Sequence, residues 1–179
     1  MTTPVTLTRG QAGALALVLV VSLAAAALYV GAERPYGDRR LARLAVLDLS
    51  IATEEYASLE TSRAVYSAEL DERHAFVDLY LHSDSADRLP EVTAHTRRAW
   101  RAYLVADQAW RLYEAGEARP LVAEVYGAEE LLEEIPELAV LRKNGEPQID
   151  NEDLAFVRAC FTVAAAERDA AAAALDAAE

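Results

Sequence analysis

The chain has 179 residues, with 30 acidic and 17 basic side chains and a net charge of −13 at pH 7. Because this acidic balance repels nucleic-acid phosphates, we expect no DNA or RNA partner. The single cysteine, Cys160, excludes an intramolecular disulfide and a Cys-based metal site. The sequence contains no nucleophile elbow, glycine-rich phosphate loop or cofactor fingerprint, so we predict neither an enzyme nor a bound cofactor.

The N-terminal region predicts a membrane anchor. Residues 10–32 carry no charged side chain and are rich in Leu, Val and Ala. A transmembrane helix needs roughly 20 mostly apolar residues, so this segment is expected to cross a bilayer once, as a signal anchor. A short polar tail, residues 1–9, precedes it, and residues 33–37 form a hinge. A cleavable signal peptide has a shorter apolar core of about 7–15 residues, although Val30–Ala32 would suit cleavage.

The orientation of this anchor has two interpretations. Basic residues are denser after the apolar run than before it, which favours a cytoplasmic domain. These residues are Arg34, Arg39, Arg40 and Arg43, against Arg9 and the amino terminus. A very short polar tail before a first helix is instead typical of a signal anchor whose domain is exported. We expect a single-pass protein of the inner (cytoplasmic) membrane with its bulk exported to the periplasmic or extracytoplasmic side, and leave the cytoplasmic orientation open.

Almost everything after the hinge has helical periodicity, and strand-like alternation is absent. We therefore predict an all-α domain over residues 38–179, folded as an antiparallel bundle of about four helices. The predicted helices are 38–81, 89–115, 120–142 and 151–178. The first helix is the longest, and its two adjoining apolar stripes predict two neighbouring helices. The second stripe holds Leu47, Ile51, Val65, Phe76 and Leu79.

Turn and capping residues mark the predicted boundaries. Pro90 suits the first turn of the second helix. Gly127 weakens the third helix, because an interior glycine costs about 1 kcal/mol relative to alanine. Asn144-Gly145-Glu146-Pro147 is a strong turn signal, and Asp150 or Asn151 is expected to cap the last helix.

The helix at 89–115 carries the strongest candidate binding face. Opposite and beside its core stripe, it combines Trp and Arg, which are enriched at the centres of protein–protein interfaces. The candidate contact residues are Arg97, Trp100, Arg101, Leu104 and Arg111. In the simpler interpretation, this helix packs on two neighbours, and Trp100 and Leu104 are buried between them.

Arg63 is a second candidate site, because it falls within an apolar stripe where a charge needs a partner. The structural interpretation is an ion pair with Glu55, Glu69 or a glutamate of the predicted helix 120–142. The functional interpretation is that Arg63 binds a carboxylate ligand, whose geometry the guanidinium matches. The sequence contains no Glu-x-x-His motif of the kind that bundle di-metal sites use, so we predict no metal site.

Two functional hypotheses follow. The leading one is a membrane-anchored, non-enzymatic interaction module, an accessory or scaffold subunit that binds other proteins of a membrane complex. The pattern is also compatible with a homo-oligomer. The alternative is an exported ligand-sensing domain, since a membrane helix followed by a helical bundle resembles in layout the periplasmic sensor domains of bacterial chemoreceptors. Such receptors return through a second membrane helix to a signalling domain. Neither follows the last predicted helix in this sequence, so we expect such a sensor to signal through a partner protein.

Overall fold

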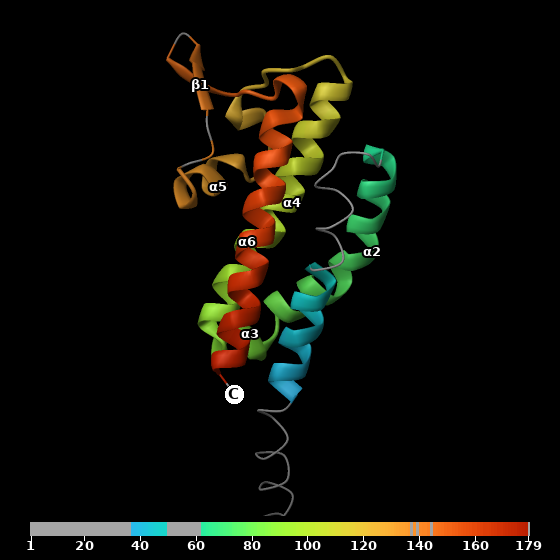
Figure 1. Ribbon diagram of the computed structural model, residues 1–179, viewed down its shortest axis with the longest axis vertical. Coiled ribbons are helices and arrows are strands. Elements are labelled where there is room, and N and C mark those ends of the chain that lie inside the picture. The colour runs from blue at the N-terminus through green and yellow to red at the C-terminus, as the bar shows by residue number, and fades with distance from the viewer. Residues whose placement is uncertain (1–36, 50–61, 137, 139, 144, 179) are drawn as a thin grey trace, which may run out of the picture. The chain divides into compact units, whose positions relative to one another are not determined.

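The computed structural model describes residues 37–49, 62–136, 138, 140–143 and 145–178. Most of these residues are helical, which confirms a mostly helical domain (Figure 1). The helices are, in chain order, residues 37–49, α2 (Arg63–Leu81), α3 (Asp84–Arg88), α4 (Pro90–Glu114), α5 (Ala128–Glu134) and α6 (Ala155–Ala177). The described residues also form two 3-10 turns, η1 (Val122–Glu124) and η2 (Glu152–Leu154), and two strands, β1 (Val140–Lys143) and β2 (Glu146–Ile149).

The α4 and α6 helices lie side by side and form the most extensive helix pair in the described part of the chain (Figure 1). They run antiparallel. Near the start of α4, His95 contacts Glu167 in the second half of α6. Near the end of α4, the carbonyl of Ala109 accepts a hydrogen bond from Asn151, just before α6. This pair is the centre against which the other elements pack.

The aromatic core joins α2, α4 and α6, and consists of Tyr66, Tyr103, Trp110 and Phe161. The Phe161 ring meets the Tyr66 ring edge-on at a centroid distance of 5.2 Å and an interplanar angle of 88°. The buried hydroxyl groups are satisfied, as such groups must be. The Tyr66 hydroxyl donates to the Tyr103 carbonyl at 2.9 Å, and the Tyr103 hydroxyl donates to the Leu49 carbonyl at 3.2 Å.

A second cluster, the small-residue core, lies at the other end of α4 and α6. Its members are Ala42, Ala45, Val46, Tyr80, Val92, Ala171 and Leu175. A chain of buried hydrogen bonds crosses it. The Tyr80 hydroxyl lies 2.8 Å from the Thr93 hydroxyl, which itself donates to the Ala86 carbonyl at 2.8 Å. Tyr80 therefore donates to Thr93, and α2 is tied to α4 at this end.

The prediction of one continuous helix over 38–81 is wrong. The first helix is described up to residue 49, and Ser62 is extended (φ −70°, ψ 147°) at the start of α2. The two segments pack on α4 in opposite directions. Leu49, at the end of the first helix, and Tyr66, in the first turn of α2, both form a hydrogen bond with Tyr103 of α4. A continuous helix would be about 65 Å long, against about 38 Å for α4 with its 25 residues. Reversal lets both segments bury apolar residues against the same helix.

The prediction of a helix over 120–142 is also wrong. Gly127 has a left-handed φ of +81°, so the helical part, α5, begins only at Ala128 and spans seven residues. The chain then forms an antiparallel hairpin in which Val140 pairs with Ile149 and Lys143 with Glu146. Gly145, with φ +89°, lies in its turn, so the predicted turn is confirmed at Gly145, whereas Glu146 and Pro147 of the predicted turn belong to β2. Strands of four residues are too short to show alternation.

The helix predicted at 89–115 matches α4, with Pro90 in the first turn as expected. The last helix begins at Ala155 rather than at 151, because Asp153 and Leu154 have left-handed φ values of 51° and 58°. The residue in the N-cap position of α6 is therefore Leu154. The side-chain oxygen of Asn151 nevertheless accepts from the Val157 N–H in the first turn of α6 at 3.4 Å, so the predicted capping role is confirmed for Asn151.

The membrane prediction falls on residues that the structure does not describe. Within the described ranges, no helix combines the length and the hydropathy that crossing a bilayer requires. The predicted anchor at 10–32, the tail at 1–9 and nearly all of the hinge at 33–37 lie outside those ranges. The anchor therefore stays a prediction from the sequence.

Candidate functional site

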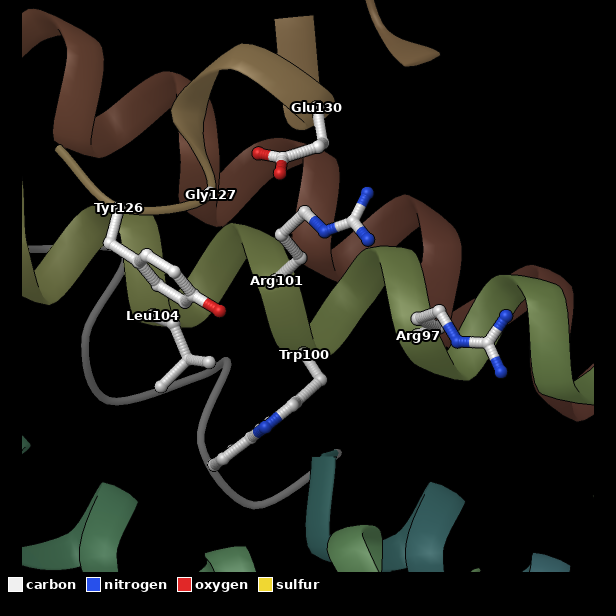
Figure 2. A pocket seen from close by; sticks show the side chains of 7 residues that line it. All are labelled: Arg97, Trp100, Arg101, Leu104, Tyr126, Gly127 and Glu130. Carbon is white, nitrogen blue, oxygen red and sulfur yellow. The ribbon is translucent and has the colours of Figure 1, made fainter. Parts of the chain in front are cut away.

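A groove between α4 and the start of α5 is the candidate site (Figure 2). Its cavity volume is about 150 Å³. The residues that line it are Arg97, Trp100, Arg101, Leu104, Tyr126, Gly127 and Glu130. The structure thus brings together four of the five predicted contact residues and adds three from the segment that precedes and begins α5. We call this site the α4–α5 groove.

The α4 side of the groove follows from helical spacing. Arg97, Trp100, Arg101 and Leu104 lie close together on one face of the helix, because their positions fall within two turns at steps of three or four residues. Trp100 is only 8% exposed and belongs to the same cluster of buried residues as the aromatic core, and Leu104 is partly buried against that cluster. Burial of Trp100 and Leu104 between helices is therefore compatible with a role in binding a partner. Their side chains pack into the core and also form the apolar floor of the groove.

The α5 side is held against α4 by backbone geometry. The Tyr126 N–H donates to the Gln108 side-chain oxygen at 3.0 Å. At Gly127, an added Cβ would lie an ordinary 3.6 Å from the Arg101 side chain, so the positive φ rather than lack of space favours glycine there. The Tyr126 ring is 81% exposed at the rim of the groove. A large exposed ring beside a buried indole is a typical contact element.

The charges of the groove differ in how they are paired. Arg101 forms an ion pair with Glu134 of α5, with a nitrogen–oxygen distance of 2.9 Å. Arg97 is exposed and makes no hydrogen bond or ion pair with the rest of the protein over the described ranges. Figure 2 shows Arg97 at the end of the row remote from Tyr126. The groove therefore has an apolar floor and a guanidinium available to a partner.

The two remaining predicted residues lie elsewhere. Arg111 is exposed on the last turn of α4 and does not line the α4–α5 groove. Arg63 faces α4, where its Nε donates to Glu114 at 2.7 Å and its Nη1 to Asp107 at 3.4 Å. The acidic partners of Arg63 are thus on α4, not on residues 120–142. A ligand-binding role for Arg63 stays a prediction.

Two further groups bear on chemistry. Burial raises the pKa of the Cys160 thiol far above its ordinary value, so this cysteine is protonated at neutral pH and is not a nucleophile. His95 Nδ1 and Arg98 Nε lie 2.7 Å and 2.9 Å from the same Glu167 oxygen, which links α4 to α6. Within the described residues, no group of three or more His, Cys, Asp or Glu side chains is arranged to hold a metal ion.

Comparisons with protein-family models, with curated proteins and with solved structures found no match for this chain. The function is therefore argued from the geometry of the site. Sequence reasoning identified the α4 side of the groove and missed Tyr126, Gly127 and Glu130, because it placed them inside a continuous helix. The glycine next to an aromatic residue was the available signal, since a glycine inside a predicted helix can adopt a left-handed φ that interrupts the helix.

Proposed function

We propose that this chain is a membrane-anchored, non-enzymatic interaction module, an accessory or scaffold subunit of a larger membrane complex, and that the α4–α5 groove binds its partner. The observation that carries the proposal is the groove itself, in which the exposed Tyr126 ring and the Arg97 guanidinium flank an apolar floor. The uncharged run at residues 10–32 supports the membrane anchor.

The chemistry of the groove defines the partner segment. Other arginines of the domain, such as Arg63, Arg88 and Arg98, each contact a carboxylate of the same chain. Over the described ranges Arg97 has no such contact, although acidic residues outnumber basic ones by 30 to 17 in the chain. A guanidinium matches a carboxylate in geometry, and an apolar floor favours one buried apolar side chain. We therefore expect a partner segment with an acidic residue next to a Leu, Met or aromatic residue.

Matched variants test this proposal. The full chain, tagged at its C-terminus, is purified from gently solubilised membranes, and co-purifying proteins are quantified by mass spectrometry. Arg97→Glu and Tyr126→Ser should each reduce a stoichiometric partner at least tenfold. Arg111→Glu makes the same charge change on the same helix outside the groove, and should leave the partner unchanged. Equal recovery with all variants, or recovery of no stoichiometric partner with the wild type, would contradict the proposal.

The ligand-sensing alternative predicts a different result, and centres on Arg63. Its Nε and Nη1 atoms already contact Glu114 and Asp107, so a carboxylate ligand would have to compete with these two acids. If Arg63 binds a ligand, Arg63→Ala should abolish stabilisation of the protein by that small molecule and leave the fold largely intact. If Arg63 is structural, the same change should lower the unfolding temperature equally with and without small molecules.

A further inference from the structure

The side of α2 that faces away from α4 exposes large apolar residues. Val65 is 48% exposed, Phe76 46% and Leu79 56%. At 100° per residue, these three lie within an arc of about 100°, together with the exposed residues Ala68, Glu72 and Ala75. We call this arc the outer face of α2. The sequence predicted that its apolar residues pack on a neighbouring helix, and for Val65, Phe76 and Leu79 this prediction is wrong within the described structure.

The spacing on the outer face is that of a helix-packing seam. Residues 65, 68, 72, 75 and 79 alternate steps of three and four, the pattern that keeps a seam facing a partner helix. Val65 and Leu79 stand at the two ends of this seam, and the small side chains of Ala68 and Ala75 allow a close approach between them.

The middle of the seam carries a negative charge. Glu72 is exposed and makes no hydrogen bond or ion pair with other parts of the described chain, and the same holds for its exposed neighbour Asp71. A carboxylate at the centre of an apolar seam is costly to bury unless a cation meets it. Charge complementarity therefore favours a partner helix with a basic residue at the centre of its own seam.

Two other occupants fit these charges less well. A lipid bilayer would have to accept the Glu72 carboxylate in its apolar part, which is unfavourable, and anionic lipids would repel both acids. A second copy of this chain, related by a two-fold axis, would place the same acidic surface against itself. The net charge of −13 opposes that association as well.

We propose that the outer face of α2 is a second docking surface, and that it binds an amphipathic helix of a partner protein with a basic residue at the centre of its apolar seam. This inference goes beyond the α4–α5 groove and does not depend on it. The two surfaces have opposite charge preferences, so one chain would hold two different partners, which is what a scaffold does.

The test uses the purified full chain in mild detergent and two fluorescent helical peptides of about three heptads. Both peptides carry Leu at the seam positions. One has Lys at the central seam position, and the other has Glu there. Fluorescence anisotropy measures binding. We expect the Lys peptide to bind wild type at least tenfold more tightly than the Glu peptide, and Glu72→Lys to reverse that preference.

Matched variants separate this surface from the groove. Phe76→Ser and Leu79→Ser should each weaken binding of the Lys peptide at least tenfold, with unchanged circular dichroism, because both side chains are already exposed. Tyr126→Ser, in the groove, should not change it. Equal binding of the two peptides by wild type would overturn the proposal. So would loss of binding in Tyr126→Ser, or sedimentation of the wild-type chain as a dimer that Leu79→Ser dissociates.

Discussion

The two cores of this domain differ in the side chains that fill them. The aromatic core fills its volume with the rings of Tyr66, Tyr103, Trp110 and Phe161, whose edge-on contacts depend on the shape of each ring. The small-residue core contains three alanines, at which helix backbones can approach closely, together with Val46, Tyr80, Val92 and Leu175. Shape-dependent packing should fail when a side chain is truncated, whereas close backbone packing should fail when a side chain is enlarged. The same pair of helices, α4 and α6, contributes to both.

Truncation in the aromatic core should produce the largest effect. Phe161→Ala removes a ring that contacts Tyr66, Tyr103 and Trp110, and should lower the free energy of unfolding by about 3–5 kcal/mol. Urea unfolding followed by circular dichroism measures this. Leu175→Ala, in the small-residue core near the end of α6, should cost only about 2 kcal/mol. Equal costs for the two variants would break the contrast between the cores.

The buried side chain of Asn151 links the end of α4 to the start of α6. Asn151 is fully buried, donates to the Ala109 carbonyl at 2.9 Å and accepts from the Val157 N–H at 3.4 Å. Asn151→Ala removes both hydrogen bonds and leaves the Val157 N–H without its side-chain acceptor, so it should cost about 2–3 kcal/mol in urea unfolding. Asn151→Asp should be at least as damaging, because it removes the donor and buries a carboxylate. If Asn151→Asp retains wild-type stability, the side chain does not act through its amide.

Enlargement tests the small-residue core. Ala171 is fully buried there, and Ala171→Leu should separate the packed helices and cost about 1–3 kcal/mol. The matched control is Ala173→Leu, an exposed position two residues further along α6, which should change stability by less than about 0.5 kcal/mol. Similar urea midpoints for the two variants would mean that the small-residue core can accommodate a leucine at position 171 without strain.

The extent to which the fold could be predicted from the sequence differs between regions of the domain. The positions of α4 and α6 follow from long periodic stripes, and Pro90 marks the start of α4. The break before α2 could not be predicted, because the helical period continues through it and only the packing of both segments on α4 favours reversal. The hairpin was missed for a different reason. Its strands have four residues each, so only the Asn144-Gly145 turn pointed to it.

The candidate site divides in the same way. Side chains that share one helix face are predictable from spacing alone, which is why Arg97, Trp100, Arg101 and Leu104 were found. Tyr126 and Glu130 join them only through a tertiary contact between α5 and α4, and no local pattern contains that contact. The ion pair of Arg101 with Glu134 could not be predicted either, since helical spacing does not say which acidic residues of another helix lie opposite Arg101.

The smallest predicted effect concerns the one large polar group of the small-residue core, and it depends on pH. Burial raises the pKa of the Tyr80 hydroxyl above its ordinary value of 10.0, since the ionised form is poorly solvated there. Below pH 10, both the folded and the unfolded states keep the proton, and the contribution of Tyr80 to stability is complete. As the pH rises through 10, the unfolded state ionises first and gains stability relative to the folded state.

Tyr80→Phe removes both the titration and the hydrogen bond to Thr93. At pH 7 the variant should be less stable than wild type by about 1 kcal/mol, the usual net value of one hydrogen bond. Above pH 10 the wild type should lose stability faster than the variant, so the difference between their urea midpoints should narrow. A difference that stays constant from pH 7 to 11 would show that the Tyr80 hydroxyl is solvated in the folded protein. The small-residue core would then be open to water, unlike the aromatic core.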